Sequence, residues 1–300
     1  MKPLLRREFI ASACTAALTS SACTAAPSPP NIGIEVYSLL QQIGKDPAAT
    51  LKQVAAVGFK TIELATFFSF GSPAEVRKML DDAGLVCPSL HTAAEPVQTA
   101  IDAAKILGAK YLVAAACWKK DVPATKDTDV LAVLNSLTLD DYKWNADLFN
   151  KNGEAARNAG LTFAFHNHNF DFKKLDGVVA YDELLRLTNK ELVKLELDCG
   201  WMIVAGFSPA EYLRKYGSRY QLLHTRDFQA GFPHSLTLGP AEMGLSCPLG
   251  KGSIDYAPIF AAAKDAGVRE YFVEQEPTLH VPLADSLKID YAYMNRQLVG

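Results

Sequence analysis

The segment Leu161-Thr-Phe-Ala-Phe-His-Asn-His-Asn-Phe170 decides how the rest of the chain is interpreted. Apolar and aromatic residues lead into His166, Asn167 and His168, as in a buried strand that ends at a polar opening. Because successive side chains of a strand point to opposite faces, His166 and His168 share one face and Asn167 lies on the other. If that face looks into a barrel, two imidazoles project into one small space.

Three later segments repeat this pattern of an apolar run that ends in a carboxylate or an imidazole. They are Lys194-Leu-Glu-Leu-Asp198, Gln221-Leu-Leu-His224 and Glu270-Tyr-Phe-Val-Glu274. In a parallel barrel the carboxyl ends of the strands meet at one face, which is where such barrels carry their active sites. The sequence therefore predicts a metal site at successive strand ends.

Short strand-like runs alternate with helical segments along the chain. The expected strands are Ile32–Leu39, Lys60–Ala65, Val86–Thr92, Tyr111–Ala116, the segment around His166, Lys194–Cys199, Gln221–Phe228 and Tyr271–Gln275. The expected helices are Pro47–Val57, Pro73 to Gly84 with Ser72 as N-cap, Ala94–Leu107, Leu139–Ala159, Pro209 to Gly217, Tyr256–Ala266 and Leu283–Gln297. This alternation predicts an α/β fold, a single-domain (β/α)8 TIM barrel, with residues 117–136 as a loop that covers the mouth. A doubly wound open sheet shares the alternation, but no glycine-rich phosphate loop follows the first strand.

The composition and the net charge limit the classes of function that the chain can have. The chain has 300 residues, 49% of them hydrophobic and 21% charged, as in an ordinary globular protein. A net charge of −3 and the absence of a Lys/Arg stripe argue against nucleic acid as a partner. Four cysteines, at positions 87, 117, 199 and 247, follow the N-terminal segment without paired spacing, so we expect free thiols rather than a disulfide framework.

The first thirty residues are expected to lie outside the fold. Met1–Ile10 carries Arg6 and Arg7 and resembles a twin-arginine export signal, followed by an Ala/Ser/Thr-rich stretch that is too polar and short to span a membrane. The expected organisation is therefore a signal peptide and linker at 1–30, a barrel at 31–300, and a periplasmic location without stable membrane insertion. The alternative is a disordered cytoplasmic tail with a chance arginine pair. Lipidation at Cys23 is not expected, because Ser20 stands where a branched apolar residue is usual.

Polar residues stand at nearly every expected strand end. They are Glu35, Glu63, His91, His166 with His168, Glu196 with Asp198, His224 with Asp227, and Glu274 with Glu276. Any one of them is easily explained as a buried side chain satisfied by a neighbour. Several acids that face one lumen, however, are costly to bury without a cation or tight hydrogen bonding. Mixed imidazole and carboxylate donors suit Mn²⁺, Zn²⁺, Co²⁺ or Fe²⁺ better than Ca²⁺.

The order of these motifs resembles the sugar phosphate isomerase/epimerase superfamily of xylose isomerase-like barrels, over nearly the whole chain from Ile32 onward. The segments that carry the resemblance are Thr162–Phe172, Glu196–Trp201, His224–Phe228, Leu249–Tyr256 and Phe272–Glu276. The resemblance implies one divalent metal per chain, held by a Glu, an Asp, a His and a Glu after strands five to eight. Asp198, His224 and Glu274 match the last three, and His166 stands in the place of the first glutamate.

This departure bears on the chemistry. In the family's epimerases the missing glutamate and the strand-eight glutamate are acid/base groups on opposite faces of the substrate. An imidazole can still bind a metal or carry a proton near neutral pH, so Glu274, His166 and His168 are the catalytic candidates. His166 is the expected ligand, and His168 is either a substrate contact or the ligand in its place. Four further residues are expected near the substrate: Glu63, His91, Trp118 and Trp201.

These residues favour a divalent-metal-dependent isomerase or epimerase that acts on a sugar or keto-sugar through an enediolate. The alternative is a lyase or hydratase that acts on 3-keto-glycosides with the same metal site. A non-catalytic sugar-binding barrel is a further alternative from another class. An endonuclease, by analogy with related three-zinc barrels, is disfavoured because the chain has few spare histidines and no basic face.

Overall fold

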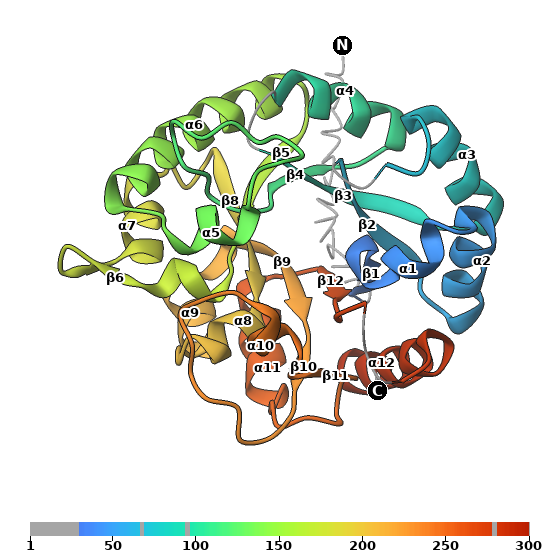
Figure 1. The fold of residues 1–300 in the computed structure, drawn as a ribbon. Coiled ribbons are helices and arrows are strands. Elements are labelled where there is room, and N and C mark those ends of the chain that lie inside the picture. The colour runs from blue at the N-terminus through green and yellow to red at the C-terminus, as the bar shows by residue number, and fades with distance from the viewer. Residues whose placement is uncertain (1–29, 67–68, 94–96, 278–280, 300) are drawn as a thin grey trace, which may run out of the picture.

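The computed structural model describes residues 30–66, 69–93, 97–277 and 281–299. Eight parallel strands close into a barrel in the order β1-β12-β9-β8-β5-β4-β3-β2 (Figure 1), which confirms the predicted TIM-barrel fold. The barrel strands are β1 (Asn31–Glu35), β2 (Thr61–Ala65), β3 (Val86–Thr92), β4 (Tyr111–Ala114), β5 (Thr162–His166), β8 (Val193–Asp198), β9 (Tyr220–Thr225) and β12 (Glu270–Val273).

Helices surround the strands as a ring. The outer helices are α2 (Pro47–Val57), α3 (Pro73–Ala83), α4 (Val97–Leu107), α6 (Leu139–Asn158), α7 (Ala180–Leu187), α9 (Pro209–Tyr216), α11 (Ala257–Ala266) and α12 (Leu283–Leu298). The shorter elements are η1 (Val36–Leu39), α1 (Leu40–Ile43), α5 (Val130–Asn135), η2 (Asn169–Phe172), β6 (Lys174–Leu175), β7 (Val178–Val179), α8 (Cys199–Val204), η3 (Gly217–Arg219), β10 (Asp227–Phe228), α10 (Pro240–Met243) and β11 (Ser246–Cys247).

Local sequence signals explain the ends of α3. The Ser72 hydroxyl accepts the Glu75 backbone N–H, and the Glu75 carboxylate accepts the Ser72 N–H at 2.8 Å, so the first turn has a capping box. Gly84 ends the helix in the left-handed region at φ 72°, where a side chain would be strained. These are the bounds that the sequence predicts.

Several expected strands end earlier than predicted: β4 ends at Ala114, β9 at Thr225 and β12 at Val273. The early ends of β1 and β8 share one reason. The Glu35 carboxylate accepts the Tyr37 N–H, which turns the chain into η1 rather than extending β1 to residue 39. The Asp198 carboxylate accepts the Trp201 N–H at 2.7 Å and starts α8, so Cys199 is helical. In both cases a strand-end acid caps the following turn.

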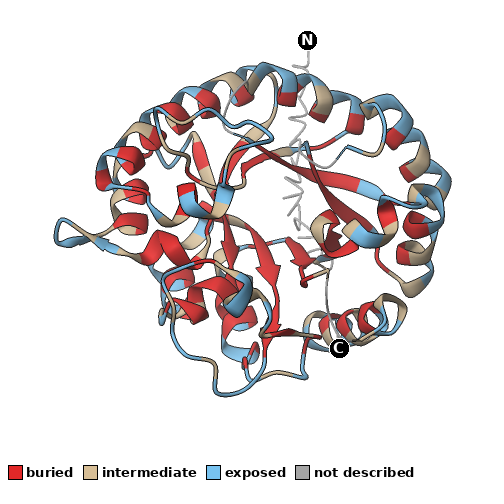
Figure 2. Cartoon of the chain, viewed as in Figure 1, coloured by how far each residue is buried: buried red, intermediate tan, exposed pale blue. Residues whose placement is uncertain are grey.

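The interior of the barrel is layered with the two-residue period of its strands. Figure 2 shows that most of the length of the barrel strands is buried. Val113, Ala164, Leu222 and Phe272 form a small buried cluster on these strands. The residues two positions further along β5, β9 and β12 are His166, His224 and Glu274. An apolar plug therefore lies beneath a polar layer at the carboxyl ends of the strands.

The four cysteines of the described residues are free thiols, as expected: Cys87, Cys117 and Cys199 are buried and Cys247 is partly buried. The expected export signal with Arg6 and Arg7, and Cys23, lie outside the described residues. Within the described ranges, the helices are too short or too polar to traverse a lipid bilayer.

Candidate metal centre and substrate cavity

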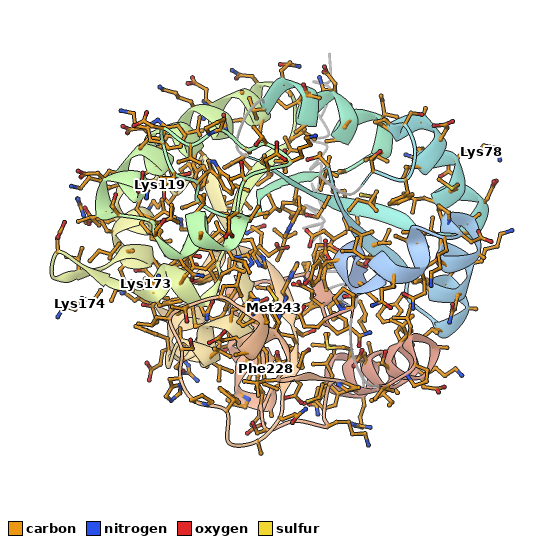
Figure 3. The ribbon with its side chains drawn as sticks, viewed as in Figure 1. Lys78, Lys119, Lys173, Lys174, Phe228 and Met243 are labelled. Atoms are coloured by element: carbon orange, nitrogen blue, oxygen red, sulfur yellow. The ribbon has the colours of Figure 1, made fainter. Side chains whose placement is uncertain are left out.

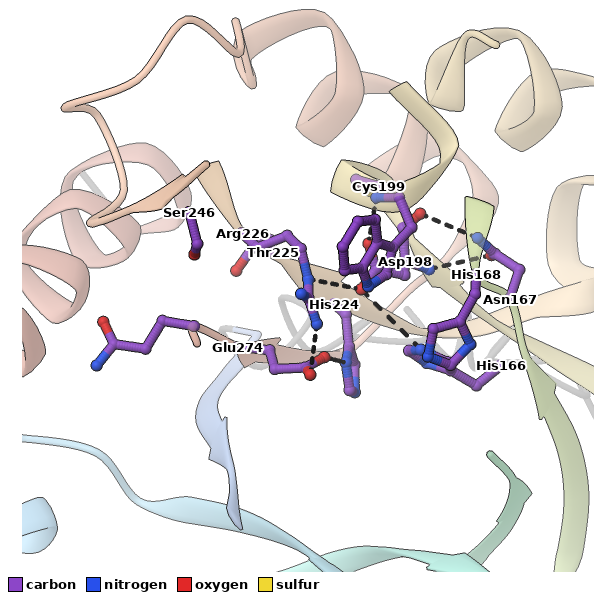
Figure 4. A network of polar contacts seen from close by, with 12 residues as sticks. His166, Asn167, His168, Asp198, Cys199, His224, Thr225, Arg226, Ser246 and Glu274 are labelled. Carbon is purple, nitrogen blue, oxygen red and sulfur yellow. Dashed lines mark hydrogen bonds and ion pairs between the residues drawn. The ribbon is translucent and has the colours of Figure 1, made fainter. Parts of the chain in front are cut away.

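Four strand ends bring His166, Asp198, His224 and Glu274 together, and Figure 4 shows them converging. One possible ligand atom from each residue lies within 4.8 Å of those of the other three, and all four residues are buried. Strand register produces this grouping, since Asp198 pairs directly with His224 across β8 and β9. These are the four residues that the sequence suggested as metal ligands, so the structure contains a cluster that could hold a metal ion.

Carboxylates beneath the cluster orient both histidines. His166 Nδ1 lies 3.0 Å from Glu196 Oε2, which leaves Nε2 directed to Asp198 Oδ2 at 4.0 Å. His224 Nε2 lies 2.5 Å from Glu63 Oε2, and its Nδ1 lies 2.8 Å from Glu274 Oε2. Each ring thus has one nitrogen held by a deeper acid and one nitrogen turned to the cluster. A carboxylate–histidine arrangement of this kind fixes the tautomer of a metal-binding imidazole.

A second grouping lies one layer deeper and contains His91, His166, Glu196 and His224. Within this grouping Glu196 Oε2 lies 2.6 Å from His91 Nε2 and 3.3 Å from His224 Nε2, and Glu196 Oε1 has no hydrogen bond among the described residues. In the upper cluster, Asp198 Oδ2 likewise has no hydrogen bond among the described residues, although it forms an ion pair with Arg226 Nε at 3.0 Å. The upper cluster offers two imidazoles and two carboxylates, whereas the deeper grouping offers three imidazoles and one carboxylate, so the upper cluster is the better fit for a divalent cation.

The pKa values of the four cluster residues shift in different directions. Burial opposes protonation of His224, but the Glu196 and Glu63 carboxylates outweigh it and raise its pKa well above the usual value. Burial raises the pKa of Glu274 less than Arg226 and His224 lower it, so that carboxyl stays ionised. Burial raises the pKa of Asp198 to about 6. Because the donor atoms of these groups bind either a proton or a metal, the two compete for the site.

Arg226 is a buried cation of this site, and no role was predicted for it from the sequence. Its Nε lies 3.0 Å from Asp198 Oδ2, it forms an ion pair with Glu274, and its Nη1 lies 3.2 Å from Glu276 Oε1. The guanidinium carbon lies 4.8 Å from the centre of the Trp201 ring, in cation–π contact. Arg226 therefore ties two of the candidate ligands to the wall of the site.

A cavity of about 980 Å³ opens over the cluster. Its polar floor consists of Glu35, Tyr37, His91, His166, His168, Arg226, Glu274 and Glu276. Trp118 and Trp201 also line it, where the sequence led us to expect substrate contacts. Glu63 is not among the described residues that line the cavity. It is fully buried beneath the histidines and accepts the Ser89 hydroxyl, which fits an orienting role rather than a substrate contact.

His168 faces the cavity outside both groupings. Its ring stacks on Phe170 at 5.2 Å between centres, and Nδ1 has no hydrogen-bond partner in the described chain. Burial lowers the pKa of His168 well below its usual value, so the imidazole is neutral. The structure thus separates the two histidines of β5, with His166 in the cluster and His168 turned to the cavity.

Asp227, another acid that was expected at a strand end, has a structural role. Its carboxylate accepts the backbone N–H groups of Gly250 at 2.9 Å, Gly252 at 3.0 Å and Ile254 at 3.1 Å. It therefore holds the long loop before α11 in place.

A closed parallel barrel with a buried His/Asp/Glu cluster at the carboxyl ends of its strands defines an α/β-barrel of the kind that builds metal-dependent active sites. The chain belongs to the xylose isomerase-like TIM barrel family, because the sequence model of that family matches residues 51–288. It is 26% identical over 193 residues to an inosose dehydratase of Clostridium beijerinckii, a match that covers 61% of this chain and 63% of that protein.

The structural neighbours share the fold. A sugar phosphate isomerase/epimerase from Parabacteroides distasonis superposes with a TM-score of 0.70 at 23% identity, over 92% of this chain and 96% of that one. The IolI protein, solved with a bound zinc atom, superposes with a TM-score of 0.62 at 15% identity, over 89% of this chain and 98% of that one. The chain spans less than two thirds of the length of the dehydratase it matches.

Proposed function

We propose that this protein is a divalent-metal-dependent enzyme that removes a proton next to the carbonyl of a keto-sugar or keto-cyclitol and then eliminates a leaving group. The observation that carries the proposal is the buried cluster of His166, Asp198, His224 and Glu274 at the floor of a cavity. The zinc atom in a neighbour of the same fold and the dehydratase name of a sequence relative support it.

The cluster residues would hold the cation through His166 Nε2, an Asp198 oxygen, His224 Nδ1 and a Glu274 oxygen. A divalent cation bound there supplies Lewis-acid chemistry that polarises a carbonyl and acidifies the adjacent C–H bond. Mixed nitrogen and oxygen donors favour Mn²⁺, Zn²⁺, Co²⁺ or Fe²⁺.

His168 is the proposed base. It is neutral, its side chain lines the cavity, and its ring centre lies 4.9 Å from that of His166. A neutral imidazole can accept the C–H proton and become the imidazolium. Tyr37 donates a hydrogen bond to Glu276 at 2.7 Å, and both line the cavity. This pair is the proposed source of the proton that leaves with the departing hydroxide or alkoxide.

Elimination is favoured over epimerisation because of the residue at the end of β5. Epimerases of this type use two acid/base glutamates on opposite faces of the substrate, and His166 replaces one of them. Isomerisation or epimerisation is the second candidate function, and the P. distasonis neighbour named as an isomerase/epimerase favours it. Both reactions begin with the same proton transfer, and only elimination loses water or an alcohol.

The test is proton exchange with scyllo-inosose, a keto-inositol, in deuterated water, with and without a chelator. Deuterium uptake that a chelator abolishes is expected, together with a product whose mass is lower than that of the substrate by one water. Uptake without loss of water would assign isomerase chemistry instead. Neither uptake nor turnover with this probe or with 3-keto-glucosides would favour the non-catalytic sugar-binding alternative.

We also propose that the protein is exported to the periplasm by the twin-arginine route. The support is the Arg6-Arg7 pair and the weakly apolar stretch that follows it. Cell fractionation tests this directly, with the double variant Arg6→Lys/Arg7→Lys as comparison. Periplasmic wild-type protein and retained variant are expected. Cytoplasmic location of both would contradict export.

A further inference from the structure

The cavity is larger and more apolar than a sugar requires. Its volume of about 980 Å³ lies at the upper end of the range, about 300–1,000 Å³, of pockets that hold drug-sized ligands. Most of the polar lining residues lie on the floor near the cluster, and Lys120 and Asp121 line the cavity from the loop between β4 and α6. The wall on one side consists of Trp118, Val122, Val130, Leu131, Trp144 and Met243, which we call the apolar arm.

The apolar arm comes from two loops and from α6, which carries Trp144. Residues 118–131 belong to the loop between β4 and α6, which contains α5, and Met243 belongs to α10 in the loop after β10. In Figure 1, α5 lies inside the ring of outer helices, and Figure 3 shows Met243 toward the middle of the mouth. Lys78 and Lys174, by contrast, extend outward in Figure 3.

Hydrogen bonds fix these loops to each other. Asn135 donates to the Leu238 carbonyl at 2.8 Å and accepts the Leu238 N–H at 2.8 Å, which joins the end of α5 to the opposite loop. Asn169 donates to the Thr237 carbonyl at 2.6 Å, and the Lys173 ammonium donates to the Asn135 carbonyl at 2.6 Å. The arm is therefore a preformed wall, which reduces the ordering cost of binding.

The central aromatic side chain of the arm has no polar group left for a ligand. The Trp118 indole N–H donates to the Val122 carbonyl at 2.6 Å, and the buried Asn145 holds the Trp118 backbone at both its N–H and its carbonyl. The ring thus offers only an apolar face. Val130 is 48% exposed at the start of α5, although it is a large hydrophobic residue that lines the cavity. Apolar surface gathered next to a polar site marks a place for an apolar ligand group.

We infer that the substrate is a glycoside that carries a planar aromatic aglycone, with the keto-sugar ring on the polar floor and the aglycone in the apolar arm. This inference rests on the proposed function for its chemistry and extends it to the substrate class. In the elimination step, His168 takes the proton next to the keto group. The electron pair of that C–H bond forms a carbon–carbon double bond in the sugar ring as the bond from the sugar to the aglycone oxygen breaks, and the aglycone leaves as the phenol or alcohol after it receives a proton from the Tyr37–Glu276 pair.

Binding tests the aglycone site without any turnover. The probes are phenyl β-D-glucopyranoside and methyl β-D-glucopyranoside, titrated by calorimetry into the full chain in the presence of Mn²⁺. Burying the phenyl ring is expected to tighten binding about tenfold to a hundredfold over the methyl glycoside. Val130→Asp is expected to reduce this preference at least about threefold, because it places a charge in the arm. Val178→Asp, which changes a similarly exposed valine of β7, is the matched control and is expected to keep it.

Equal affinities for the two glycosides would overturn the inference, as would a preference that Val130→Asp leaves unchanged. The 3-keto derivatives of the same glycosides, incubated in deuterated water, test the proposed function separately. Phenyl preference in binding without exchange would support the aglycone site and refute the enolisation. Deuterium exchange together with equal affinities for the two glycosides would support the enolisation and refute the aglycone site.

Discussion

Replacing Glu196 by Gln is the most informative single change beneath the cluster. The residue is fully buried on β8, and its Oε2 lies 3.0 Å from His166 Nδ1 and 3.3 Å from His224 Nε2. One substitution therefore removes the negative charge behind two of the proposed metal ligands. A glutamine keeps the size of the side chain but can no longer hold both imidazole N–H groups as a carboxylate does.

The expected magnitude follows from what such outer carboxylates contribute. Loss of one typically costs about 10–100-fold in metal affinity, or about 1.4–2.7 kcal/mol. Because Glu196 serves two histidines, we expect a loss near the upper end, about a hundredfold. Stabilisation by saturating metal is expected to fall by the same amount, since it follows the binding free energy.

The assay is a competition titration of Mn²⁺ or Zn²⁺ against a chromophoric chelator, at fixed pH and well below the unfolding temperature. Glu270→Gln is the matched control, because Glu270 is also buried but lies at the start of β12, bonded to Asn31 at 2.9 Å. The control is expected to keep wild-type affinity. Wild-type affinity in Glu196→Gln would refute the orienting role. Complete loss of binding would instead make Glu196 a ligand and the deeper grouping the metal site.

Three further predictions concern other residues. His166→Ala is expected to lose the bound metal, whereas His168→Ala keeps it and loses deuterium exchange. Elemental analysis measures the metal content of both variants, and the deuterium-uptake assay measures the exchange. Metal loss only in His168→Ala would reverse the assignment of the two histidines. Burial raises the pKa of Asp290 to about 7, so its carboxyl favours folding below its unfolded pKa of about 3.8. That contribution, on the order of 4 kcal/mol at most, is lost as pH rises to about 7. Asp290→Asn is therefore expected to be more stable than wild type at pH 8 in denaturant titrations and similar near pH 4, and a destabilised variant at pH 8 would contradict this. Gly200→Ala would place a Cβ into the Arg226 side chain, and overpacking of this kind costs about 1–3 kcal/mol. Thermal unfolding measures that cost, and an unchanged midpoint would show that Arg226 can move away.

Much of the fold and the cluster could be predicted because both depend on short-range patterns. Period-two alternation placed the polar ends of β5, β8, β9 and β12, and Ser72 and Gly84 fixed the ends of α3. The same alternation could have identified Arg226, which stands two residues after His224 and so shares its face. It would equally have turned Asp227 to the other face, where the structure shows it bonded to the loop before α11.

The depth of each side chain could not be predicted from one sequence. Glu63 and Glu35 pair across β1 and β2, yet Glu35 lines the cavity and Glu63 lies under the histidines. Depth in a barrel depends on the tilt and stagger of the strands, which the sequence does not encode locally. The apolar arm depends on two loops that are far apart in the chain and meet through Asn135 and Leu238. No local sequence pattern therefore predicts it.

The central claim is a cation bound by His166, Asp198, His224 and Glu274. The most direct test is an anomalous difference map from crystals of the protein grown with Mn²⁺. One strong peak is expected within about 2.0–2.3 Å of a donor atom from each of these four residues. A peak held by His91 and Glu196, or no peak at saturating metal, would contradict it.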